Sequence, residues 1–241
     1  MNIVLFDPTE IGLPLARSDE RCKHVLKVLR RAVGTTFDVG LINGPRGKAT
    51  VEAINSEVLS LSFSWAPPHT VAPTTQIVIG LPRPQTARDV LRDATTLGAT
   101  GLDFIATARS DPNYAQSSLW TKHQWRRHVI QGAAQAFDTH VPSVTWDQSL
   151  STVLNQHRDS GHLFIALDVY GPTAQLSQLK LSHCEQPVTL LVGPERGWDE
   201  ADRVELAAHH IVRYSLGPRV LRTENVVLVA LTLINAARDH A

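Results

Sequence analysis

The chain has 241 residues, 43% hydrophobic and 19% charged, and its 23 basic and 23 acidic residues give a formal net charge of zero at pH 7. This composition is typical of a globular protein with one large or two small domains. No apolar run approaches the length of a membrane span, and the N-terminus does not resemble a signal peptide. Two cysteines and 11 scattered histidines form no metal-binding pattern. We therefore expect a cytoplasmic protein without membrane or metal partners.

Residues 1–70 have the pattern of a small β-rich domain with one helix. An apolar stripe at helical spacing predicts that helix, and its members are Cys22, Val25, Leu26, Leu29 and Val33. Strand patterns follow at 36–42, 48–54 and 59–65, and in the last of these apolar residues alternate with serines. Strands at this spacing suggest a small antiparallel barrel.

A second face of the same predicted helix is basic. Between positions 21 and 31 there is no acid, and the basic residues are Arg21, Lys23, Lys27, Arg30 and Arg31. Such a stripe can neutralise phosphates without reading sequence. An ordinary solvated helix face explains the same pattern equally well.

Residues 66–75 contain three prolines and few large apolar residues, so we expect a linker there. Beyond it, over residues 71–241, strand and helix patterns alternate as in an α/β domain. We predict strands at 77–81, 102–106, 144–146 and 163–169, and helices at 87–97, 125–137 and 150–157. Because unknotted connections are the rule, these elements alone favour a doubly wound parallel sheet.

The C-terminal part of this domain contains two strand patterns that end in similar turns. The apolar run 188–192 stops at Gly193-Pro194, and the run 211–216 stops at Gly217-Pro218. Between them, Asp199 is placed to cap a helix over 200–208. We expect the two Gly-Pro loops to lie side by side at the sheet edge where open α/β sheets bind ligands.

The last predicted helix is apolar on every side. Its apolar residues are Val226, Val227, Leu228, Val229, Ala230, Leu231, Leu233 and Ile234. A helix of this kind is buried all round, whereas the final helix of a domain normally has a solvated face. The surplus apolar surface predicts a subunit interface.

The segment GPERGWDEAD, followed by SLGPRVLRTEN, resembles the signature of the SPOUT methyltransferases and, more narrowly, of the RsmE family. That family methylates N3 of a uridine in 16S ribosomal RNA, within the small subunit, with S-adenosylmethionine as cofactor. The resemblance implies an N-terminal PUA-like β-barrel that docks RNA. It also implies an α/β C-terminal domain with a parallel sheet, a trefoil knot and a homodimer interface.

By this resemblance the cofactor lies bent among three loops, which follow Leu167, Val192 and Leu216. The implied contacts are Leu167, Val192, Gly193, Pro194, Glu195, Gly197, Leu216, Gly217, Val220 and Leu221. Glycines allow close backbone approach, so main-chain groups can read an adenine edge and a ribose. Taken singly, each of these loops is also explained as an ordinary strand-ending turn.

Arg222 and Glu224 are the candidate catalytic residues. Uracil N3 holds its proton near neutral pH, and an arginine near the carbonyl oxygens would stabilise the developing anion. Glu224 would orient Arg222 or accept the proton. The alternative is that Thr223 caps the last helix and Glu224 is a first-turn acid. Arg196 stands where the family usually has glycine, and its role is open.

The chain departs from the family around residues 96–97 and 134–138, which line the RNA side in the family. Two alternatives therefore stay open. One is a methyltransferase with another RNA target, and the other is a non-catalytic RNA-binding factor in ribosome assembly, which would fail to bind the cofactor. A Rossmann-type methyltransferase is disfavoured because its glycine-rich loop follows the first strand of the domain.

Overall fold

The computed structural model describes residues 3–67, 73–156 and 161–239. The chain divides into two compact units, one formed by Met1–Thr70 with Ala133–Val141 and the other by Val71–Gly132 with Pro142–Ala241. Residues 68–72 of the expected linker and His157 of an expected helix lie outside the described residues. None of the helices in the described ranges combines the length and apolar character needed to cross a membrane.

A five-stranded sheet forms the first unit, in the order β1-β3-β4-β5-β2, with a 3-10 turn η1 (Pro8–Glu10). The strands are β1 (Val4–Phe6), β2 (Leu15–Ala16), β3 (Thr36–Leu41), β4 (Arg46–Ile54) and β5 (Val58–Trp65). β1 pairs with β3 in parallel, and the remaining pairs are antiparallel. The three strands expected from the sequence are therefore confirmed, and β1 and β2 are the edge strands.

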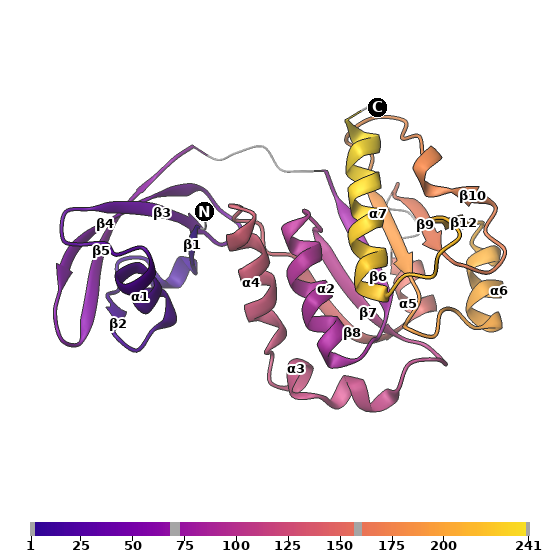
Figure 1. Cartoon of the computed structure of the whole chain (residues 1–241), viewed down its shortest axis with the longest axis horizontal. Helices are drawn as coiled ribbons and strands as arrows, with labels where there is room; N and C mark the ends of the chain where they lie inside the picture. The colour runs from indigo at the N-terminus through magenta and orange to yellow at the C-terminus, as the bar shows by residue number, and fades with distance from the viewer. Residues whose placement is uncertain (1–2, 68–72, 157–160, 240–241) are drawn as a thin grey trace. The chain divides into compact units, whose positions relative to one another are not determined.

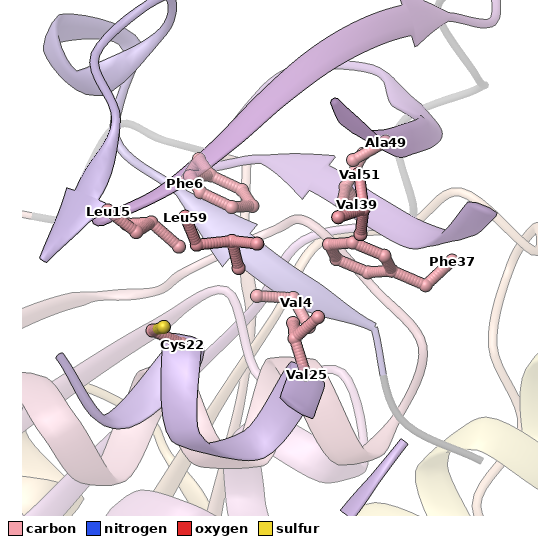
Figure 2. Packing of buried hydrophobic residues seen from close by; sticks show 10 residues of the cluster. All are labelled: Val4, Phe6, Leu15, Cys22, Val25, Phe37, Val39, Ala49, Val51 and Leu59. Atoms are coloured by element: carbon pink, nitrogen blue, oxygen red, sulfur yellow. The ribbon is translucent and has the colours of Figure 1, made fainter. Parts of the chain in front are cut away.

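The core of this unit lies between the sheet and the short helical segment (Figure 2). Ten buried side chains make up this cluster: Val4, Phe6, Leu15, Cys22, Val25, Phe37, Val39, Ala49, Val51 and Leu59. On β5, Leu61, Phe63 and Trp65 pack against the cluster, whereas Ser62 and Ser64 are exposed. The alternation expected for this strand is present.

The single helix expected to reach Val33 is wrong. The chain forms α1 (Glu20–Lys23) and a π-helical turn, η2 (His24–Val28). It leaves the helix at Arg30, whose φ is 51°, and Val33 is 59% exposed. The cause is strand pairing, because the Gly34 N–H donates to the Val51 carbonyl over 2.8 Å and draws the chain onto β4. Arg30 therefore lies beyond the helix and does not continue the face of Lys23 and Lys27.

The second unit contains a seven-stranded, all-parallel sheet in the order β10-β12-β9-β11-β6-β7-β8 (Figure 1). Its strands are β6 (Thr75–Gly80), β7 (Gly101–Ala106), β8 (Ser143–Ser149), β9 (Leu163–Leu167), β10 (Ala174–Gln175), β11 (Val188–Val192) and β12 (Val212–Ser215). Every residue of β6 and β11 is buried, as expected for parallel strands covered on both faces. The α/β class with a parallel sheet is confirmed.

Helices cover both faces of this sheet. They are α2 (Pro84–Thr96), α3 (Ser118–Thr121), α4 (Trp125–Gln135), α5 (Leu150–Gln156), α6 (Glu200–Ala208) and α7 (Thr223–Arg238), with 3-10 turns η3 (Pro112–Gln116) and η4 (Leu176–Gln178). α5 and α6 share one core cluster with residues of β6, β9 and β11. α7 packs against α2, and both lie in front of the sheet in Figure 1. Asp199 caps α6, as predicted, and it also forms a capping box with Asp202.

The two Gly-Pro loops follow β11 and β12, and β9 lies between these strands and pairs with both. The chain runs from β6 outward to β7 and β8, and then continues at β9 on the other side of β11. The strand order therefore reverses between β6 and β11, and open α/β sheets usually bind ligands at the carboxyl ends of strands near such a reversal.

Candidate active site

A pocket of about 190 Å³ lies at the carboxyl ends of β9, β11 and β12. The loops that follow these three strands line it, so β9 supplies a third wall between the two Gly-Pro loops. All ten residues predicted to hold the cofactor line this pocket: Leu167, Val192, Gly193, Pro194, Glu195, Gly197, Leu216, Gly217, Val220 and Leu221. The structure thus brings together residues that are up to 54 positions apart, from 167 to 221.

The loop after β11 is tightly wound, and its glycines are required by its shape. The Gly197 N–H donates to the Pro194 carbonyl over 2.7 Å, and Gly197 has a φ of 69°. A Cβ at Gly193 would lie 3.0 Å from backbone atoms of Gly197 and Trp198. The loop therefore presents backbone to the pocket, which suits a ligand read by main-chain N–H and C=O groups.

Neighbouring side chains fix this loop in place. The fully buried Trp198 donates from Nε1 to the Leu167 carbonyl over 2.9 Å, which links the loops after β11 and β9. The Arg83 N–H donates to Glu195 Oε1 over 2.9 Å, and Arg109 donates to the Arg196 carbonyl over 2.7 Å. The Arg196 side chain itself is exposed at the pocket.

A second pocket adjoins the first and contains the predicted catalytic residues. Arg222 and Glu224 line it, together with Arg83, Gln85, Thr86 and Asp89 from the start of α2. Both pockets share four lining residues: Glu195, Val220, Leu221 and Thr223. A group bound in one pocket would therefore lie next to a group bound in the other, as transfer between two ligands requires.

The structure contradicts the interpretation of Thr223 as the N-cap of α7. Thr223 is the first helical residue and is 5% exposed, so it is not the cap. Arg222 occupies the cap position, with an extended backbone and an exposed side chain. Its guanidinium is accordingly available at the second pocket. Glu224 is in the first turn, as expected.

The basic residues of the first unit are not equivalent. Arg21 donates to Glu10 and Asp19 over 2.7 and 2.8 Å and lies over the Phe6 ring, 5.1 Å from its centroid. These hydrogen bonds hold the pKa of Glu10 and of Asp19 below their ordinary values. Lys23 pairs with Glu20. By contrast, the side chains of Lys27, Arg30 and Arg31 are exposed.

Sequence reasoning missed a cluster of charged residues at the wall of the first pocket. Asp168 forms ion pairs with Arg203 at 2.7 Å and with Arg213 at 3.4 Å. No motif signals these contacts, because the partners are 35 and 45 positions away in the chain. Across the described parts of the chain, no cluster of three or more His, Cys, Asp or Glu side chains could hold a metal ion.

The sequence of this chain is similar to a known family and to named relatives. The RNA methyltransferase domain family matches residues 70–235. Ribosomal RNA small subunit methyltransferase E of Treponema pallidum is 30% identical over 249 residues, covering 100% of this chain and 92% of its own length. The protein of the same name from Bacillus subtilis is 26% identical over 223 residues, covering 90% and 87%.

Solved structures share the fold over nearly the whole chain. Ribosomal RNA small subunit methyltransferase E from Neisseria gonorrhoeae, bound to S-adenosyl methionine, has a TM-score of 0.76 at 19% identity and covers 97% of each chain. A methyltransferase from Legionella pneumophila in complex with the same cofactor has a TM-score of 0.81 at 20% identity and covers 98% of each chain. With a family match over most of its length and a relative aligned over all of it, this chain belongs to the RNA methyltransferase domain family.

Proposed function

We propose that this chain is an S-adenosylmethionine-dependent methyltransferase that methylates N3 of a uridine in 16S ribosomal RNA. One observation carries the proposal: all ten cofactor residues implied by the family resemblance line one pocket, and the adjoining pocket contains Arg222 and Glu224. The names of the relatives point to small-subunit ribosomal RNA. The uridine N3 position follows from the resemblance of the two signature segments to the RsmE family.

The first pocket suits the cofactor. Its walls combine apolar side chains, among them Leu167, Val192 and Leu221, with glycine backbone. At Gly193 a side chain would crowd the backbone of the same loop. Apolar walls fit an adenine ring, and backbone polar groups fit its edge and the ribose. S-adenosylmethionine supplies a methyl group activated on a sulfonium. The chain itself must bind both partners, align them and manage one proton.

In the second pocket, Arg222 would act on the acceptor base. Its guanidinium can donate to uracil carbonyl oxygens, where negative charge develops as N3 loses its proton. Glu224, on the first turn of the same helix, would accept that proton or orient Arg222. Glu195 lies at the boundary between the pockets, where its bond from the Arg83 N–H fixes its carboxylate.

RNA docking is proposed for the first unit, as a PUA-like domain. Lys27, Arg30 and Arg31 have exposed side chains, and Lys23 lies in the same segment, so these cations can contact phosphates. Arg21 has a different role, because its guanidinium fixes Glu10 and Asp19. We place this docking on RNA within the assembled small subunit, in the cytoplasm.

A homodimer through the second unit is also proposed. Within one chain, α7 buries Val227, Ala230, Leu231 and Ile234, while Val229 remains 39% exposed. Val226 and Leu233, three residues before and four residues after Val229, are half-buried, so the three side chains form one apolar strip on the helix. A second copy of this chain would cover that strip. The resemblance extends to a trefoil knot, which we propose for the segment from β11 to α7.

The test is calorimetric titration of the purified protein with S-adenosylmethionine, with Arg222→Ala as a parallel sample. We expect binding at about one site per chain in both proteins, because Arg222 lies in the second pocket. Methyl transfer by Arg222→Ala should fall on the order of a hundredfold or more, as for loss of a donor to a developing oxyanion. Absence of cofactor binding in the unsubstituted protein would favour a non-catalytic RNA-binding factor.

A further inference from the structure

Asp168 follows directly after β9 and lines the first pocket, outside both signature segments. Its side chain is 2% exposed. Arg203 donates to its two carboxylate oxygens over 2.7 and 3.4 Å, and Arg213 donates over 3.4 Å. Burying a carboxylate costs desolvation free energy unless charged partners and hydrogen bonds compensate for the lost water. Arg203 and Arg213 supply that compensation here.

The partners of Asp168 belong to the elements next to the other two pocket loops. Arg203 is on α6, the helix that the chain enters from the loop after β11. Arg213 is on β12, the strand that leads into the third loop. The same carboxylate accepts the Tyr170 N–H over 3.0 Å. One side chain therefore links the elements that carry all three walls of the pocket.

The wall after β9 depends on this link because it has little packing of its own. Val169 and Tyr170 line the pocket, yet they are 52% and 63% exposed. Both arginines hold Tyr170 as well: Arg213 donates to its carbonyl over 3.0 Å, and the Arg203 guanidinium lies 5.3 Å from its ring centroid. Removing the Asp168 charge would release this wall and leave two arginines without their shared partner.

We infer that Asp168 is a positioning residue, which fixes the three loops in the arrangement that binds S-adenosylmethionine. The inference rests on the proposed function. Burial alone would raise the pKa of Asp168, but the hydrogen bonds from Arg203 and the Tyr170 N–H outweigh it and hold that pKa below its ordinary value. The carboxylate is therefore charged at neutral pH, and its two ion pairs are present in the working enzyme.

The experiment compares Asp168→Asn with Asp103→Asn by calorimetry, methyl-transfer kinetics and melting temperature. Asp103 is a matched control: it is 6% exposed, it accepts hydrogen bonds from Gln76 and Thr145, and neither pocket includes it. Asp168→Asn should raise Kd and KM for S-adenosylmethionine on the order of tenfold to a hundredfold, as expected for a displaced site, with kcat at saturating cofactor nearly unchanged. Asp103→Asn should lower the melting temperature and leave Kd unchanged.

Two further variants guard against a folding defect in Asp168→Asn. Asp168→Glu restores the charge and should recover part of the lost affinity. Arg213→Gln leaves the ion pair between Asp168 and Arg203 in place and should raise Kd by less than Asp168→Asn does. The double variant with Asp168→Asn and Arg213→Gln should bind about as weakly as Asp168→Asn alone. If Asp168→Asn and Arg213→Gln bind the cofactor as tightly as the unsubstituted protein, the inference is overturned and the proposed function stands. If the unsubstituted protein binds no cofactor, both are overturned.

Discussion

Gly80, the last residue of β6, lies against the loop after β11. A Cβ at this position would overlap the ring and backbone nitrogen of Pro194. Pro194 has a backbone that cannot easily yield, because its carbonyl accepts the Gly197 N–H across the turn. The shape of the first pocket therefore depends on a single residue of the neighbouring strand β6, because Gly80 has no side chain.

Gly80→Ala should consequently displace the loop and weaken cofactor binding. Overpacking of this kind typically costs about 1–3 kcal/mol, which corresponds to a loss of affinity of roughly 5- to 150-fold if the loop absorbs the strain. Gly40→Ala is the control, because its Cβ would meet the side chains of Thr139 and Leu5 in the first unit. Both variants should melt earlier, but an unchanged Kd for S-adenosylmethionine in Gly80→Ala would contradict this account.

Among the elements, α7 contributes to the second pocket and would also carry the proposed dimer interface. Its first turn carries Glu224 to the second pocket, and its exposed strip includes Val229. We predict that Val229→Asp converts a homodimer into a monomer, because it places a charge in an apolar interface. Val204→Asp changes another exposed valine, on α6, and should leave the dimer intact. Sedimentation would detect the difference, and a dimeric Val229→Asp protein would rule out this interface.

Elements with local signals were predictable from the sequence, and those set by distant pairing were not. Asp199, followed by acidic residues, predicts the start of α6, and in the structure Asp199 and Asp202 form a capping box there. The segment after Val28 has a helical pattern but leaves the helix, because Gly34 pairs with Val51. Likewise, each Gly-Pro turn is visible in the sequence, whereas the position of β9 between the two strands depends on pairing across the sheet.

The residues of the candidate site also fall into a group that the sequence predicts and a group that it does not. The gathering of the ten loop residues in one pocket could be predicted, because the resemblance carried by the two signature segments implies that these loops lie together. Asp168, Arg203 and Arg213 could not, because ordinary charged residues far apart in sequence carry no periodicity or spacing.

For the whole molecule, stability should depend on a few carboxylates with shifted pKa values. Hydrogen bonds from Arg21 lower the pKa of Glu10 and Asp19, and the pKa of Asp168 is lowered despite its burial. Each group stabilises the fold above its ordinary pKa, about 3.9 for Asp and 4.3 for Glu, and this stabilisation is lost as pH falls through the lowered value. Burial raises the pKa of Asp202, which acts in the opposite direction.

Three lowered pKa values against one raised value predict a net loss of stability on acidification. The melting temperature should therefore fall below about pH 4, where these carboxylates take up protons on unfolding. Arg21→Gln should flatten this dependence, because it removes the cause of two of the shifts. A melting temperature that is constant or rises between about pH 5 and 3 would contradict the assignment of these ion pairs.

The most direct measurement of the proposed reaction is methyl transfer from labelled S-adenosylmethionine to small ribosomal subunits that lack the modification, followed by nucleoside analysis of their RNA. We expect labelled 3-methyluridine in 16S ribosomal RNA, formed by the unsubstituted protein and nearly absent with Arg222→Ala. Labelled RNA containing a different methylated nucleoside, or no labelled RNA from a protein that binds the cofactor, would contradict it.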